Sequence, residues 1–209
     1  MAYLTNLIET VEAELAQLSQ RDPWQAQVPF LLQLPGIGLI TAMTVLASIG
    51  DITRFASAKR LVGYAGLGAR IHASGQVQRS GSITKSGRAE LRTVLVEAAW
   101  TSVRTSPWWR ARFAELTARM PAAKAIVAIA RKLLVVIWQV LTARSADRQA
   151  DPVAVARRLF RWGSVHRLAT QRGLGRGAFV RYYLDQIGVG QELTHLFING
   201  FTFTLEASG

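Results

Sequence analysis

The chain has 209 residues, half of them hydrophobic, and a formal net charge of +12 from 25 basic and 13 acidic residues. This length suits one compact domain with appendages, or two small domains. The absence of cysteine excludes disulfides, thiolate nucleophiles and cysteine zinc sites, and fits a cytoplasmic protein. Of the basic residues, 21 are arginine. Because the planar guanidinium suits phosphate oxygens, we expect nucleic acid as a partner, with a charge that only promotes solubility as the alternative.

The N-terminal segment predicts a helix of coiled-coil character over residues 1–21. Its apolar residues follow a 4-3-4-3 spacing, namely Leu4, Ile8, Val11, Leu15 and Leu18. Such a stripe favours either self-association through residues 4–18 or packing of a surface helix on its own domain. Its first fifteen residues contain no basic residue, so they do not resemble a secretory signal.

Two apolar stretches raise the question of a membrane. Residues 23–50 contain no charged side chain, but prolines and glycines interrupt them, which predicts two short buried helices around a tight turn. Residues 122–141 include Lys124, Arg131 and Lys132, so we expect a core helix with one wet face. We therefore expect no membrane association.

The remaining segments predict a mainly α fold. Helices are expected over 56–65, 86–103, from Pro107, and over 121–143, while residues 66–81 alternate polar and apolar and predict an irregular loop or short β-hairpin. Residues 144–151 predict a polar linker, and Asp151-Pro152 predicts the start of the next helix. The stretch from about Thr194 is apolar and rich in residues that favour β-strands, and its place in the fold is not predicted. We expect a linker helix at 1–21, a domain at 22–143, and a helical extension at 144–209.

Residues 34–38, with the sequence LPGIG, match the turn of a helix-hairpin-helix. Glycines let the backbone turn tightly, and the amides at the start of the next helix can then bind a phosphate oxygen. Gly36, Ile37 and Gly38 are therefore candidate DNA-binding residues. An ordinary turn between two helices is the alternative.

A second candidate site surrounds Ser74, which precedes Gly75 in the Gly- and Ser-rich segment. Basic residues follow and precede it, and we take them as candidate phosphate ligands: Arg70, Arg79, Lys85, Arg88 and Arg92. A serine hydroxyl here could be a phosphate ligand, a nucleophile or a turn residue. Ser86 is expected to cap the following helix, and Trp100 to lie in the core. No histidine or carboxylate cluster has metal-ligand spacing, so no metal site is expected in this chain.

Several motifs in order give a resemblance to a known family. They are LPGIG (34–38), YAGL (64–67), SG (74–75), GSITKSG (81–87) and LRTVLVEAA (91–99). This pattern, spread over roughly residues 28–142, resembles the C-terminal domain of the insertion-sequence-110 transposases, also called the 116/110/902 transposases. The proline that usually follows AGL in the family is replaced by Gly68-Ala69.

The resemblance implies DNA transposition by a serine recombinase. Such enzymes combine an N-terminal RuvC-like domain, whose acidic residues bind magnesium, with a C-terminal domain whose serine forms a covalent link to DNA. The corresponding serine here is Ser74. Some members use a guide RNA. No RuvC-like acidic segment is evident in this sequence, so we expect the C-terminal part of a transposase, with magnesium needed only alongside an acidic partner domain. The alternative is a catalytically inactive DNA-binding remnant.

Overall fold

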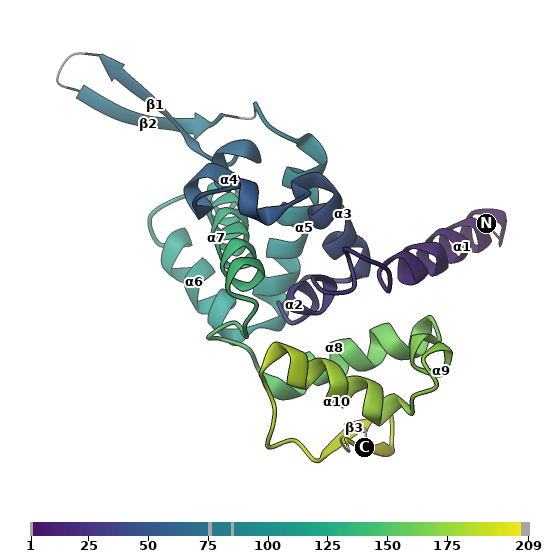
Figure 1. Ribbon diagram of the computed structural model, residues 1–209. Helices are drawn as coiled ribbons and strands as arrows, with labels where there is room; N and C mark the ends of the chain where they lie inside the picture. The colour runs from purple at the N-terminus through teal and green to yellow at the C-terminus, as the bar shows by residue number, and fades with distance from the viewer. Residues whose placement is uncertain (1, 75–76, 85, 206–209) are drawn as a thin grey trace. The chain divides into compact units, whose positions relative to one another are not determined.

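The computed structural model describes residues 2–74, 77–84 and 86–205 (Figure 1). The chain forms two compact units, one made of residues 1–43 with 143–209 and the other of residues 44–142. Helices dominate both units, which confirms the mainly α fold. The first unit thus joins the N-terminal segment to the C-terminal one, and the second lies between them in sequence.

The unit of residues 44–142 begins inside α3 (Leu39–Ile49) and contains η1 (Ile52–Arg54), α4 (Ala58–Tyr64), β1 (Ala69–Ser74), β2 (Val77–Ile83), α5 (Ala89–Thr105), α6 (Pro107–Thr117) and α7 (Ala122–Ala143). Helix α7 is its central element. Ile126, Ile129, Leu133 and Ile137 recur at helical spacing on its buried face. The indole nitrogen of Trp138 donates to the carbonyl of Phe55 at 3.0 Å, which ties α7 to the segment after η1.

Length and composition alone would allow α7 to cross a membrane, since its apolar window has a mean hydropathy of 1.9. Half of that window is buried inside the protein, and Lys124, Arg131 and Lys132 are exposed. A buried apolar face opposite a charged face is the pattern of a core helix. The structure thus confirms the expected core helix with one wet face.

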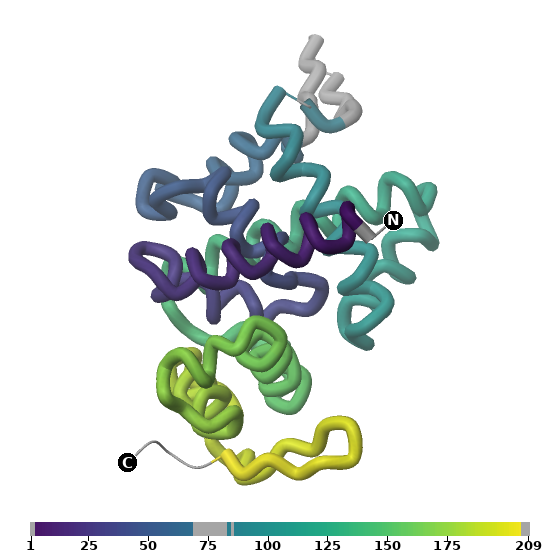
Figure 2. Tube along the Cα trace, turned by 90° about the vertical axis from the view of Figure 1, so that its right-hand side faces the viewer, coloured from purple at the N-terminus to yellow at the C-terminus, as the bar shows by residue number. Residues whose placement is uncertain are grey.

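The other unit consists of α1 (Ala2–Leu18), α2 (Val28–Leu32), α8 (Pro152–Val165), α9 (Leu168–Gln171), α10 (Arg176–Ile187), β3 (His195–Ile198) and β4 (Phe201–Thr204). Helices α8 and α10 pack together around Trp162, Phe179 and Tyr183, whose ring centroids lie 4.9 to 5.5 Å apart. Strand β3 contacts α8 and β4 contacts α10. Figure 2 shows the C-terminal hairpin, in yellow, beside the green helical segments of this unit. Burial among these aromatic groups raises the pKa of Tyr183 to about 12.

Hydrogen bonds bind the N-terminal and C-terminal parts of this unit to each other. Arg158 of α8 donates to the carbonyl of Leu32 at 2.8 Å and also to that of Gln33. Its burial lowers the pKa of the guanidinium to about 10, opposed by the charge of Asp151, and the group stays protonated at neutral pH. The indole of Trp162 donates to the hydroxyl of Ser19 at 3.3 Å. Residues 19–33 therefore pack on α8.

Two local expectations were wrong. Helix α5 begins at Ala89 with Arg88 as its N-cap, so Ser86 does not cap it. Trp100 is 42% exposed and contacts Phe113 edge-to-face at 5.5 Å, so it is not a core residue. Its position between Ala99 and Thr101 on an amphipathic helix falls at the edge of the apolar face, which the sequence pattern did not resolve.

Candidate nucleic-acid interface

The segment between α2 and α3 forms the expected tight turn between two helices. Gly36 has a φ of 78°, a conformation that glycine adopts without the Cβ conflict of other residues. The amide of Ile37 donates to the carbonyl of Leu34 at 3.2 Å, and its side chain is only 2% exposed. The side chain of Ile37 therefore packs in the core, and its amide is used within the turn.

Gly38 is the exposed member of the predicted trio. Its carbonyl accepts the amide of Ala42 at 2.8 Å, so it stands at the entrance of α3. A Cβ at Gly38 would meet nothing within 4 Å, so the backbone is open at this point. The first amides of any α-helix lack partners within the helix, and here they begin directly beyond Gly38.

Strands β1 and β2 form an antiparallel hairpin, which is one of the two forms expected for residues 66–81. Ser74 is the last residue of β1, and its partner across the pair is Val77. Arg70 lies in β1, and Arg79 in β2 pairs with His72. A bulge interrupts the register between Ala69 and Ile71. Lys85 lies outside the described residues.

The base of this hairpin is locked by a close approach of two glycines. Gly66 has a φ of 69°, and a Cβ there would lie 2.8 Å from the amide nitrogen of Gly87. A Cβ on Gly87 would lie 2.1 Å from the carbonyl oxygen of Tyr64. The backbones of residues 64–66 and 86–87 thus touch, and only glycine fits at Gly66 and Gly87.

Arg92 fastens the same contact. Its guanidinium donates to the carbonyl of Gly87 at 2.8 Å and to that of Ala65 at 3.2 Å, and the amide of Thr84 donates to Gly68 at 2.9 Å. Arg92 was expected to bind phosphate. Because it is half-buried and bonds two backbone carbonyls, the structure gives it the role of a positioning residue for the hairpin.

Arg88, by contrast, is exposed beside this base. Its Nε donates to the hydroxyl of Tyr64 at 3.2 Å, and that hydroxyl donates to the carbonyl of Ser48 at 2.9 Å. The Arg54 guanidinium lies 4.8 Å from the centre of the Tyr64 ring. Burial raises the pKa of Tyr64, but the hydrogen bond and charge of Arg88, together with Arg54, outweigh it and leave the pKa lowered.

Tyr64 and Arg88 line a shallow depression of about 560 Å³ at the start of α5, together with the other residues of 63–64 and 86–90. The exposed guanidinium of Arg88 and the polarised phenol of Tyr64 in this lining suit a phosphate group, and Glu90 is the one acidic residue beside them. Sequence reasoning found Arg88 but missed Arg54 and Tyr64. A signal was present, since Tyr64 belongs to the YAGL motif, but nothing in the sequence shows that Arg54 stacks on its ring.

The carboxylates of the described residues do not form a metal site. No group of three or more His, Cys, Asp or Glu side chains converges within residues 2–74, 77–84 and 86–205. The carboxylate of Asp51 accepts from the hydroxyl of Thr53 at 2.7 Å and from its amide at 2.9 Å, which lowers the pKa of Asp51 and caps η1. These residues do not fit the magnesium that the resemblance implies.

Comparison with known proteins matches part of this chain to a family. Residues 28–114 match the model of the transposase IS116/IS110/IS902 family. A "Probable family 20 transposase" of Pseudomonas aeruginosa is 33% identical over 153 residues, which are 69% of this chain and 45% of that protein. The transposase for insertion sequence element IS1111A of Coxiella burnetii is 35% identical over 123 residues, 55% of this chain and 33% of that protein.

A third relative, the pilin gene-inverting protein of Moraxella bovis, is 38% identical over 114 residues, which cover 53% of this chain and 35% of that protein. The matched part of the chain therefore spans less than half of each of these relatives. It includes both the helical turn at 34–38 and the hairpin base built from residues 64–67 and 86–92. Through residues 28–114, this chain belongs to the transposase IS116/IS110/IS902 family.

Proposed function

We propose that this chain takes part in DNA transposition or a related site-directed recombination, with Ser74 as the nucleophile. The observation that carries the proposal is the locked base of the β1–β2 hairpin. Ser74 ends the strand that leaves this base, and the base is bordered by the exposed Arg88. Relatives named as transposases and as a pilin gene-inverting protein support the same class of reaction.

The proposed step is a transfer of the DNA phosphate to serine. The Ser74 oxygen forms a bond to phosphorus, and its proton passes to a base. The bond from phosphorus to one deoxyribose oxygen breaks, and that oxygen takes up a proton as it leaves. Ser74 stands at the far end of β1 from the hairpin base, so Arg88 and Arg54 bind and position a neighbouring phosphate of the DNA strand and not the reacting one. An acidic RuvC-like domain, implied by the resemblance, would supply the metal-binding carboxylates, since the described residues here do not.

The helical turn supplies the proposed contact with duplex DNA. Gly38 leaves the backbone open at the start of α3, so a phosphate oxygen can approach the first amides of that helix. Such a contact positions the backbone without reading sequence. A guide RNA, which the resemblance implies for some members, is proposed as a second polyanionic partner of the same cationic chain.

A covalent capture experiment tests the role of Ser74. The full chain is combined with a RuvC-like acidic domain, fused or supplied in trans, and a nicked DNA substrate that traps the adduct. Ser74→Ala should abolish the adduct and leave duplex affinity within about two-fold, because alanine removes no charge. Ser145→Ala, at an exposed serine outside both the hairpin and the depression, is the control and should retain the adduct. An adduct that survives Ser74→Ala, or maps to Ser80 or Ser82, refutes the assignment and favours a DNA-binding module without chemistry.

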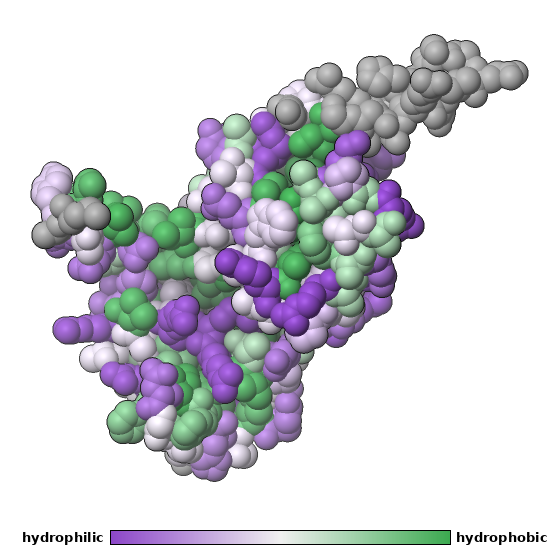
Figure 3. All heavy atoms as spheres, turned by 180° about the vertical axis from the view of Figure 1, so that it is seen from behind, coloured by the Kyte–Doolittle hydropathy of each residue, from purple (hydrophilic) through white to green (hydrophobic). Residues whose placement is uncertain are grey.

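Self-association through α1 is the remaining part of the proposal. Leu4, Ile8 and Val11 are 60%, 58% and 48% exposed, and Leu18 is also exposed. Figure 3 shows hydrophobic residues along this helix, in the arm at the left of the view. A stripe with the spacing of a coiled-coil seam, left open to solvent, favours burial against the same stripe of a second copy.

A further inference from the structure

The C-terminal residues contain a second candidate site, distinct from the hairpin of Ser74. A cleft of about 570 Å³ lies between one face of α8 and the tip of the β3–β4 hairpin. Helix α8 contributes Arg157, Phe160, Arg161 and Ser164, and the hairpin contributes Phe197 and Asn199. The α8 residues follow the spacing of one helical face, so they line the cleft together.

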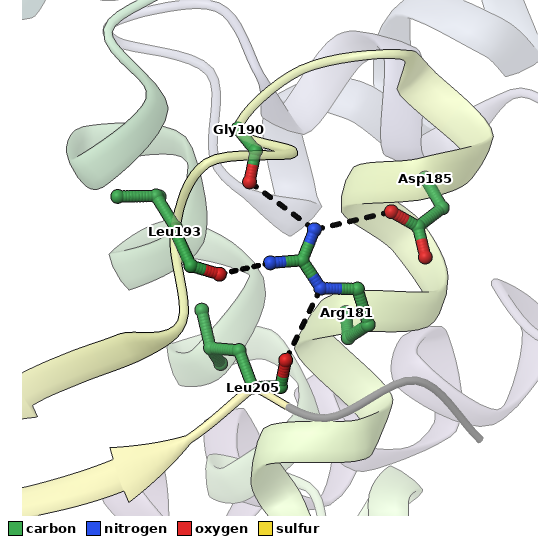
Figure 4. Close-up of polar contacts among 5 residues, drawn as sticks. All are labelled: Arg181, Asp185, Gly190, Leu193 and Leu205. Carbon is green, nitrogen blue, oxygen red and sulfur yellow. Dashed lines mark hydrogen bonds and ion pairs between the residues drawn. The ribbon is translucent and has the colours of Figure 1, made fainter. Parts of the chain in front are cut away.

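The walls of the cleft are held in place by buried contacts. Phe160 packs against Phe203 of β4, with ring centroids 4.5 Å apart. The guanidinium of Arg181 donates to the carbonyls of Leu193, Gly190 and Leu205, which lie before and after the two strands (Figure 4). The hairpin is therefore fixed at its base, and its tip beside α8 is presented in a defined position.

The charge of the cleft is positive. Arg157 and Arg161 are exposed, and they stand one helical turn apart, with Cβ atoms about 6 Å from each other. Neither forms an ion pair with a carboxylate of the described residues. Two arginine forks at this spacing suit the oxygens of a phosphate or of successive phosphates.

An exposed aromatic ring and an unused hydroxyl accompany the arginines. Phe197 is 61% exposed although it is a large apolar side chain, which is costly without a partner. The hydroxyl of Ser164 is buried and has no hydrogen-bond partner among the described residues. Such groups are rare in folded proteins and call for a ligand or water.

We propose that this cleft binds an unpaired nucleotide of a single-stranded nucleic acid. Arg157 and Arg161 bind the phosphates, and the ring of Phe197 stacks on the base. Stacking requires a base free of its partner, so the cleft discriminates against intact duplex. The inference does not depend on the chemistry of Ser74 or on the turn at Gly38.

The test uses the full chain and fluorescent twelve-residue oligonucleotides of thymidine or uridine, with a duplex of matched length for comparison. Replacing Arg157 and Arg161 together by alanine should weaken single-strand binding at least ten-fold and flatten its salt dependence. Phe197→Ala should weaken it about five-fold or more. The control replaces the exposed Arg148 and Arg176, which lie outside the cleft, by alanine. It should retain the single-strand affinity of the parent chain within about three-fold.

Photo-cross-linking with an oligonucleotide that carries 5-iodouracil gives a second readout, since the iodinated base couples to a stacked aromatic ring. The adduct should map to the peptide that contains Phe197. Binding of either the DNA or the RNA strand supports the proposal, and a preference between them reports on the 2′ hydroxyl. The proposal would be overturned if the cleft variants kept the affinity of the parent for the single strand. It would also be overturned if the control variant lost as much single-strand affinity as the cleft variants, or if the cleft variants lost as much duplex affinity as single-strand affinity. None of these outcomes alters the Ser74 adduct.

Discussion

The guanidinium of Arg181 donates to the carbonyl of Gly190 at 3.1 Å and to the carboxylate of Asp185 at the same distance. The same side chain also bonds the carbonyls of Leu193 and Leu205, so one buried cation holds the chain segments on both sides of the β3–β4 hairpin (Figure 4). A pair of four-residue strands is only marginally stable by itself, because its ladder has few hydrogen bonds, and the Arg181 contacts add stability to the hairpin.

Arg181→Met should therefore lower the free energy of unfolding by roughly 2–4 kcal/mol, because the carbonyls lose a charged donor while they stay buried. Urea unfolding followed by tryptophan fluorescence measures the change. Arg176→Met, on the exposed first turn of the same helix, is the control and should cost less than about 0.5 kcal/mol. Equal stability of the two variants would show that the Arg181 contacts contribute little.

Gly87→Ala should disturb the base of the β1–β2 hairpin. A Cβ there would lie 2.1 Å from the carbonyl oxygen of Tyr64, so residues 64–66 and 86–87 must separate, at a cost on the order of 2 kcal/mol or more. Gly68→Ala serves as the control, since its Cβ meets nothing within 4 Å. The midpoint temperature of thermal unfolding and the yield of the Ser74 adduct should both fall for Gly87→Ala, and neither should fall for Gly68→Ala.

The helical turn allows folding to be separated from binding. Gly36→Ala should destabilise the protein by about 1–2 kcal/mol, because alanine is strained at a φ of 78°. Gly38→Ala should leave stability nearly unchanged but weaken duplex binding several-fold, because its Cβ would stand in the space through which a phosphate approaches α3. Full duplex affinity of a folded Gly38→Ala variant would contradict the proposed contact.

Replacing Leu4, Ile8 and Val11 together by serine should reduce self-association without unfolding the chain, since all three are exposed. The measurement is the molar mass by light scattering across a range of concentrations. A matched variant carries Thr10→Ser and Ala13→Ser, away from the 4-3-4-3 stripe, and should behave like the parent. A parent that stays monomeric at every concentration tested would exclude this interface.

Asp147 gives a prediction about pH. Burial raises its pKa above the ordinary value of 3.8, although amide hydrogen bonds oppose the shift. The folded state therefore holds this proton more tightly than the unfolded chain, so stability falls as pH rises from about 3.8 through the raised pKa. Asp147→Asn removes this loss. Urea unfolding at pH 7 and pH 3.5 gives the free energy of unfolding of the variant minus that of the parent chain. This difference should be greater at pH 7, and a greater difference at pH 3.5 would contradict the raised pKa of Asp147.

The sequence by itself determined the helical character and the order of the elements. The charges of Lys124, Arg131 and Lys132 within an apolar run predicted the core helix α7 with one wet face. Asp151-Pro152 predicted the start of α8, where the Asp151 carboxylate does accept the amide of Val153 at 3.0 Å. Ordered motifs with specific glycines predicted the family. These features are local or lie within one short segment, so a linear pattern contains them.

Tertiary structure decided which groups meet. The sequence offered Arg88 and Arg92 as equivalent phosphate ligands, but only the fold shows that Arg92 bonds the carbonyls of Ala65 and Gly87. It also brings Arg54 over the ring of Tyr64 and places β3 and β4, joined through Asn199-Gly200, against α8 and α10. Such contacts depend on the distance between residues remote in sequence. Periodicity and composition contain no information about that distance, because it is set by how the packed elements fit together.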